Sequence, residues 1–124
     1  MAPPPAQQMA GLRVAVGLGA YVAPDLTAKL FGLDPDANPQ GAYLGRLFGA
    51  RDVALAAGLT ATSGPARRLW WQIGIGCDAA DFVAAVLGVR SGSISRTTAV
   101  LAGATALAAV GLGVTGLQAE DAAV

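Results

Sequence analysis

The chain has 124 residues, enough for one domain; 54% of them are apolar and only 13% are charged. This charged share is about half that of an ordinary soluble domain, too small to cover a water-exposed surface with ionised side chains. Eight basic residues balance eight acidic ones, so there is no basic excess of the kind that nucleic-acid-binding proteins carry. We therefore expect a membrane protein, whose partner is the lipid bilayer and not a nucleic acid.

Several kinds of chemistry are excluded by residues that the chain lacks. It has no His and a single Cys, Cys77, which rules out His-ligated metals, Ser-His or Cys-His pairs and disulfide relays. No Gly-rich segment ends in Lys-Ser or Lys-Thr, so a phosphate-binding P-loop is absent. We expect no metal, no cofactor and no catalytic residue, because carboxylates alone support only acid–base work.

The first third of the chain predicts a long helix, a short one and a loop. Residues 1–8, "MAPPPAQQ", are Pro-rich and are expected to be disordered. A helix is expected over about residues 9–23, and Pro24 kinks or ends it. It lacks the basic lead-in and the cleavage site of a signal peptide, so we interpret it as a membrane span. Residues 24–33, "PDLTAKLFGL", predict a short amphipathic interfacial helix, followed by the turn-rich "DPDANPQG".

Three further helices are expected in the rest of the chain, with short connections. They cover about residues 41–62, 67–89 and 96–118. Only the last of them passes a simple hydropathy test for a membrane span. Residues 119–124 predict a short acidic tail. Strands are not favoured, because the apolar segments are long and Ala-rich and do not alternate.

These elements predict an all-α fold, a four-helix transmembrane bundle over residues 9–118, with multiple passes through the inner or plasma membrane. Trp70 and Trp71 come shortly after Arg67 and Arg68, and aromatic rings beside cations are typical of a membrane interface, so we expect them to be interface anchors. The alternative is a tightly packed soluble four-helix bundle. Against it, almost no helix has a polar outer face of the usual width.

Charged residues interrupt two apolar stretches, "FGARDVALAAGL" and "GIGCDAADFVAAVLG". If the turn between the second and third long helices is centred near residues 65 and 66, positions equidistant from it lie at the same depth. Asp78 and Asp81 then flank the level of Asp52, and a spacing of three places them on one helix face. We therefore predict that Arg51, Asp52, Asp78 and Asp81 meet near the bilayer midplane.

One Arg cannot neutralise three carboxylates. Either a second Arg reaches the cluster or at least one Asp is protonated. We include Arg46 in the predicted polar cluster, and Arg13 is the other candidate, although both could extend to the headgroups instead. The cluster either fixes the register of the helices or forms a polar pocket for a substrate, an ion or a proton.

Small residues recur at every fourth position on two of the expected helices, which lets helix backbones approach closely in lipid. On the first helix they are Gly11, Ala15, Gly19 and Ala23, and on the second they are Gly41, Gly45 and Gly49. These ridges serve packing within one subunit, a homo-oligomer or a contact with a larger membrane protein.

The numbers of Lys and Arg residues near the two membrane surfaces are nearly equal, so they hardly determine the orientation. One side has three cations, which are Arg13, Arg67 and Arg68, and the other side has Lys29, Arg90 and Arg96. The first long loop is acidic and the Arg67-Arg68 turn is basic, which favours both termini in the cytoplasm.

Several stretches taken together, "LFGLD", "GRLFGARDVALAAGL" and "CDAADFVAAVLG", resemble the small bacterial and fungal membrane proteins grouped as "domain of unknown function 4267". The most specific residues are Arg46 with Arg51-Asp52, and Asp78 with Asp81. The resemblance covers about residues 10–118 and implies a four-span membrane protein with no assigned activity. Small four-helix multidrug exporters are similar in size, but the membrane-embedded Glu of their first helix is missing here.

The Ala-, Gly- and Arg-rich composition suits a high-GC bacterium. We expect a structural or accessory membrane subunit that acts through helix packing. The alternative is a small-solute or proton-coupled transporter that uses the polar cluster. An enzyme is the least favoured class, because no pair of nucleophile and base stands out.

Overall fold

The computed structural model describes residues 3–123, and these residues form five α-helices and no strands. The helices are α1 (Pro5–Val22), α2 (Pro24–Leu30), α3 (Gly41–Ala61), α4 (Gly64–Ser91) and α5 (Arg96–Ala122). For the described residues, the expectation of an all-α chain with four long helices and one short helix is therefore confirmed.

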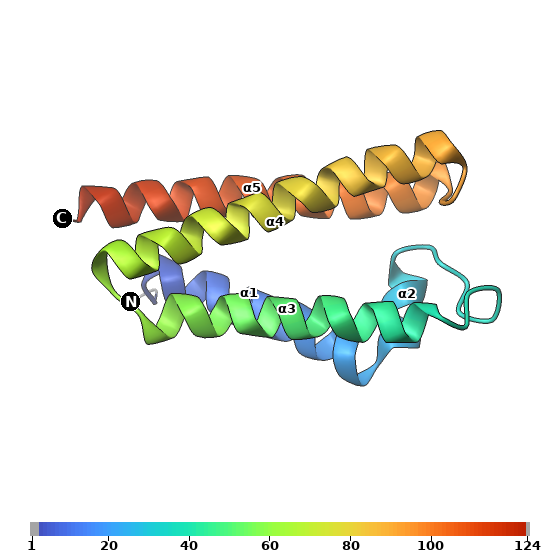
Figure 1. Ribbon diagram of the computed structural model, residues 1–124, viewed down its shortest axis with the longest axis horizontal. Helices are drawn as coiled ribbons and strands as arrows, with labels where there is room; N and C mark the ends of the chain where they lie inside the picture. Colours follow the sequence, from blue (N-terminus) through green and yellow to red (C-terminus); the bar gives the residue numbers. More distant parts are fainter. Residues whose placement is uncertain (1–2, 124) are drawn as a thin grey trace.

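The long helices form two layers of two helices each (Figure 1). The antiparallel pair α1 and α3 makes one layer and the pair α4 and α5 makes the other, whereas α3 and α4 contact each other much less. The start of α1, the α3–α4 turn and the end of α5 lie at one end of the bundle, which we call the terminal end. The opposite end, with α2, the 31–40 loop and the α4–α5 turn, is called the loop end.

The first helix begins earlier than expected. Helix α1 begins at Pro5, because proline suits the first helical position, so residues 5–8 of the segment expected to be disordered form a helical turn. Residues 1 and 2 of that segment, and residue 124 of the expected tail, lie outside the described residues.

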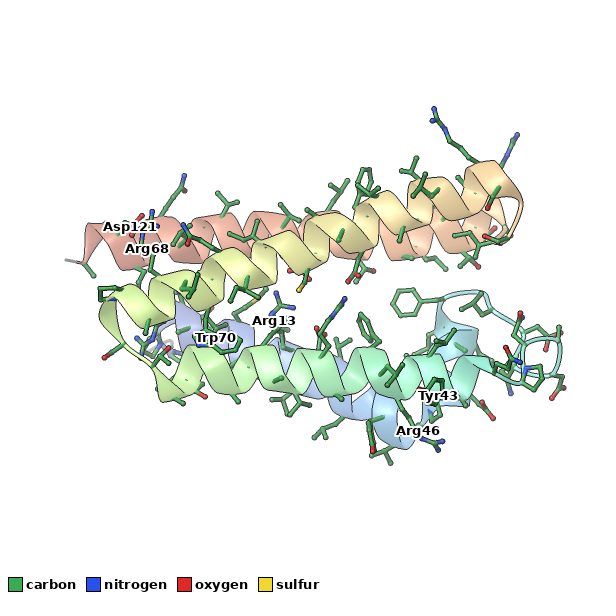
Figure 2. The ribbon with its side chains drawn as sticks, viewed as in Figure 1. Arg13, Tyr43, Arg46, Arg68, Trp70 and Asp121 are labelled. Carbon is green, nitrogen blue, oxygen red and sulfur yellow. The ribbon has the colours of Figure 1, made fainter. Side chains whose placement is uncertain are left out.

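The acidic tail expected over 119–124 is helical as far as Ala122. Its carboxylates meet the start of α4: Arg67 Nη1 lies 3.4 Å from Glu120 Oε1, and Arg68 Nε lies 3.0 Å from Asp121 Oδ1. Figure 2 shows Arg68 and Asp121 side by side at the terminal end. These ion pairs continue the contact between α4 and α5 to the end of the layer.

Trp71 is buried instead of projecting as an interface anchor, whereas Trp70 is half-buried and its role as an anchor stays a prediction. Trp71 is only 2% exposed and belongs to a small core with Ala6, Met9 and Leu59. The Trp70 ring covers Gly58, and the Trp71 ring covers Gly116, where any Cβ would overlap it. The glycines on the facing helices leave flat spaces that the indole rings fill. The local Arg-Trp pattern contains no information about these distant glycines, so it could not predict this packing.

The predicted glycine ridge on α3 takes part in packing mainly through Gly49. A Cβ built on Gly17 of α1 would lie 2.8 Å from the Gly49 carbonyl oxygen, so the two backbones are in contact there. A Cβ on Gly45 would make an ordinary 3.5 Å contact with Pro24, and one on Gly41 would come only within 3.9 Å of Asn38. The close crossing of α1 and α3 therefore depends on Gly17 and Gly49.

The ridge expected on α1 was assigned to the wrong face. A Cβ on Gly11 meets nothing within 4 Å, and Ala15 is exposed. The buried face consists of Ala6, Met9, Ala10, Arg13, Gly17 and Ala20. Small residues occur on all sides of this helix, so their spacing alone did not identify the side that packs.

Helices α4 and α5 are each long and apolar enough to cross a membrane. The expectation that only the last helix passes this test is wrong, because a stretch of α4 is apolar enough to pass it. Between Arg68 and Arg90 its only charged residues are Asp78 and Asp81.

We predict opposite effects for two glycine-to-alanine substitutions. Gly49→Ala introduces a Cβ against the α1 backbone and should lower the free energy of unfolding by about 1–3 kcal/mol. Gly11→Ala faces open space and should raise it by about 0.5–1 kcal/mol, because alanine has the higher helix propensity. Denaturation of the two variants in detergent measures both changes; equal effects would contradict the α1–α3 crossing.

Candidate functional site

The strongest concentration of buried polar groups lies halfway along the helices. Arg13 is near the middle of α1, Arg51 and Asp52 near the middle of α3, and Asp78 near the middle of α4. At a rise of about 1.5 Å per residue, these positions are about 12 to 21 Å from the ends of their helices. Figure 2 shows Arg13 directed into the space between the two layers.

Arg13 connects three helices. Its Nη1 donates to Asp52 Oδ1 and to Asp78 Oδ1, both at 3.2 Å, and its Nη2 donates to Asp78 Oδ2 at 2.6 Å. All three residues are buried, with exposed fractions of 5% for Arg13, 5% for Asp52 and 4% for Asp78. The guanidinium therefore links α1 to α3 within one layer and to α4 in the other.

Arg51 forms a second link between the layers. Its Nη1 and Nη2 donate to Asp81 Oδ1 and Oδ2 at 2.9 and 2.6 Å, a two-pronged arrangement of the strongest kind. The same guanidinium lies 4.8 Å from the centre of the Phe48 ring, and its Nη2 is 3.9 Å from Asp52 Oδ1. The side chains of Arg51 and Asp81 are each 33% exposed, so this pair forms the open rim of the cluster.

Local sequence explains how α4 accommodates the buried guanidinium. Asp78 and Asp81 are three residues apart and therefore share a face of the helix. Gly74, one turn before Asp78, is also on that face, and a Cβ built on it would lie 2.9 Å from Arg13 Nη2. The absence of a side chain at Gly74 lets the guanidinium approach the backbone of α4.

Four of the five predicted cluster residues come together: Arg51, Asp52, Asp78 and Asp81. Arg46 does not join them. Its Nε donates to the Tyr21 carbonyl oxygen at 3.2 Å, and Figure 2 shows it directed away from the space between the layers. Five residues of helix rotate Arg46 by about 140° from Arg51, which places it on another face of α3.

The second arginine in the cluster is Arg13, which the sequence left as one of two alternatives. Arg13 lies near the start of the helix expected over residues 9–23, and it becomes central because α1 begins at Pro5. One available signal was Gly74, which precedes Asp78 by four residues and leaves room on the face of α4 that carries the carboxylate. This signal does not specify which face of α1 is directed toward α4.

The cluster contains two guanidiniums and three carboxyl groups, so the carboxyl groups outnumber the arginines by one. Within residues 3–123, no group of three or more potential metal ligands is present, and the buried Nε atoms of Arg13 and Arg51 have no hydrogen-bond partner. The geometry is that of an ion-pair network between helices.

Comparisons with protein-family models, with curated proteins and with solved structures find no match to this chain. The resemblance to the "domain of unknown function 4267" proteins therefore stays a prediction. The functional argument depends on the cluster and on the surface around it.

We predict that Arg13→Gln and Arg46→Gln differ strongly in stability. Without Arg13, Asp52 and Asp78 remain buried and face each other without a cation between them, which should cost about 3–5 kcal/mol. Arg46→Gln removes an exposed side chain and should stay within about 0.5 kcal/mol of the unmodified protein. Denaturation in detergent measures both variants.

The double variant Arg13→Gln/Asp78→Asn serves as the control for this comparison. It removes a charge from each side of the pair, so it should cost less than the sum of the two single substitutions. Strict additivity, or equal losses for Arg13→Gln and Arg46→Gln, would contradict the assignment of Arg13 to the cluster.

Proposed function

We propose that the protein is a multi-pass integral membrane protein in which all four long helices cross the bilayer. In this proposal the Arg–Asp cluster holds the two helical layers together near the midplane, and the protein acts as a structural or accessory subunit. The observation that carries the proposal is an inverted distribution of residues, with charge inside the bundle and large apolar side chains outside.

The exposed apolar side chains extend over every long helix. Representative exposed fractions are 53% for Leu12 of α1, 61% for Leu44 of α3, 59% for Leu87 of α4 and 67% for Val100 of α5. Only 17% of the apolar stretch of α4 and 22% of that of α5 is buried, unlike a core helix of a soluble protein. In water such an apolar surface would promote association of the protein with itself or with other proteins, whereas in the hydrocarbon core of a bilayer it is stable in contact with lipid.

The lengths of the two less apolar helices also favour four spans. Helix α1 has 18 residues and α3 has 21. These correspond to about 27 and 31 Å, close to the roughly 30 Å thickness of the hydrocarbon core. Their central charges reduce their hydropathy, but the cluster neutralises most of that charge inside the bundle.

The charges make the helices depend on one another in a bilayer. A central Arg or Asp costs about 2.5–3.5 kcal/mol each on the insertion scale. A helix that inserts with its charge unpaired is therefore unfavourable. The pairing of Arg13 with Asp52 and Asp78 removes part of this cost only when the three helices are in one arrangement. This dependence supports a packing role, in which the cluster determines how the helices are arranged.

Helix α2 fits the expected interfacial position at the edge of such a bundle. Leu26 and Leu30 are 60% and 68% exposed, and Asp25 and Lys29 are also exposed. A short helix with an apolar side and charged residues lies favourably between headgroups and hydrocarbon.

A second candidate function is a small-solute or proton-coupled transporter. It is favoured by the excess of one carboxyl group over the arginines of the cluster and by the partial exposure of Arg51 and Asp81. A proton or a small solute that exchanges at this rim would change the net charge between the layers.

Native mass spectrometry of the full chain, extracted with mild detergent from carbonate-washed membranes, tests both functions. The packing role predicts that the protein stays with the washed membranes and appears as a homo-oligomer or in complex with a second membrane protein. Recovery in the carbonate supernatant would contradict the membrane proposal, because an integral protein is not released without detergent.

Arg51→Ala and Arg46→Ala are the matched variants for this measurement. A monomer carrying a small-molecule adduct that Arg51→Ala abolishes and Arg46→Ala retains would contradict the packing role and support the transporter. An assembly that both variants retain without an adduct would support the packing role.

A further inference from the structure

The two ends of the bundle differ in free positive charge. At the terminal end, Arg67 and Arg68 are paired with Glu120 and Asp121. The loop end carries four exposed cations, which are Lys29, Arg46, Arg90 and Arg96. Within the described part of the chain, none of these four takes part in an ion pair.

The cation count near the membrane surfaces therefore differs from the balanced count that the sequence suggests. Arg13 is buried in the middle of α1, so it no longer counts toward the terminal end. Arg46 is exposed and bonded to the Tyr21 carbonyl oxygen near the end of α1, so it counts toward the loop end. The result is two cations at the terminal end and four at the loop end.

Acidic residues do not reverse this difference. Asp25, Asp34 and Asp36 are also exposed at the loop end. Membrane orientation follows the number of Lys and Arg residues in the short loops, and Asp and Glu contribute little to it. The acidic loop, which favoured cytoplasmic termini in the sequence, is therefore a weak guide.

We propose that the loop end faces the cytoplasm, where its four cations contact the anionic phospholipid headgroups of that leaflet. The terminal end then lies on the opposite side of the membrane, the reverse of the orientation that the sequence favoured. This proposal rests on the four-span membrane protein proposed above.

The cations are arranged on several elements that the fold holds at one level. Arg90 is in the last turn of α4 and Arg96 is the first residue of α5. A Cβ built on Gly32, in the turn that follows α2, would lie 3.0 Å from Thr98 Oγ1, so this turn lies close to the start of α5.

An anionic lipid fits this surface better than a soluble acidic partner. The exposed Leu26 and Leu30 lie beside Lys29 on α2. Apolar side chains next to a cation match the boundary where hydrocarbon meets charged headgroups. Anionic lipids are concentrated in the cytoplasmic leaflet, which attracts basic segments next to membrane spans.

Cysteine labelling in intact bacterial cells tests this orientation. In a Cys77→Ala background, Ser63→Cys reports on the terminal end and Ser93→Cys on the loop end; both serines are exposed in turns. A membrane-impermeant maleimide should label Ser63→Cys in intact cells and Ser93→Cys only after permeabilisation. The reverse pattern, or labelling of both from outside, would overturn the proposal.

Carbonate extraction of the same two variants separates this proposal from the one on which it rests. A protein that remains in washed membranes with the reverse labelling overturns the orientation only. A protein that appears in the supernatant overturns the membrane-spanning proposal itself.

A matched pair of charge variants tests the cause of the orientation. Arg90→Gln/Arg96→Gln lowers the count at the loop end to the level of the terminal end, so the labelling should become mixed. Arg67→Gln/Arg68→Gln increases the difference and should leave the labelling unchanged. If Arg90→Gln/Arg96→Gln keeps the original pattern, the basic loop end does not set the orientation.

Discussion

The buried guanidinium of Arg13 is the interaction on which the arrangement of the helices depends. It is bonded to Asp52 of the same layer and to Asp78 of the other layer, so its position fixes α1, α3 and α4 relative to one another. The neighbouring structure makes this possible: Gly17 and Gly49 let α1 and α3 touch one turn away, and Gly74 leaves space on α4. A buried charge without partners is so unfavourable that these helices have few alternative arrangements.

The buried charges also bear on how apolar side chains are divided between the interior and the surface. The apolar core between the layers is small, and among the described residues the buried apolar side chains outside the Trp71 core are five Ala and one Leu. The layers are therefore held by ion pairs at mid-height, by the tryptophan core at the terminal end and by the contact of Gly32 with Thr98 at the loop end. Large apolar side chains are left for the outside, which favours lipid as the surrounding medium.

The sequence predicted the parts of the site that follow from helix geometry alone. Antiparallel depth and a spacing of three residues predicted that Arg51, Asp52, Asp78 and Asp81 lie at one level, and the structure brings their side chains together there. The choice between Arg13 and Arg46 could not be predicted, because it depends on how α1 and α3 rotate about their axes. That rotation is set by the Gly17–Gly49 contact, and glycine and alanine occur on every face of α1. The inward packing of Trp71 likewise depends on Gly116, which is far away in the sequence.

Solid-state NMR of the protein in lipid bilayers would test the central role of Arg13 most directly. With ¹⁵N-labelled Arg and ¹³C-labelled Asp, dipolar recoupling measures whether the Arg13 guanidinium is next to a carboxylate, and recoupling to ³¹P measures whether it is next to a phospholipid headgroup. We predict a strong correlation of Arg13 with the carboxylates of Asp52 and Asp78 and none with phosphorus. A correlation with phosphorus alone would mean that Arg13 extends to the membrane surface, and would contradict the account.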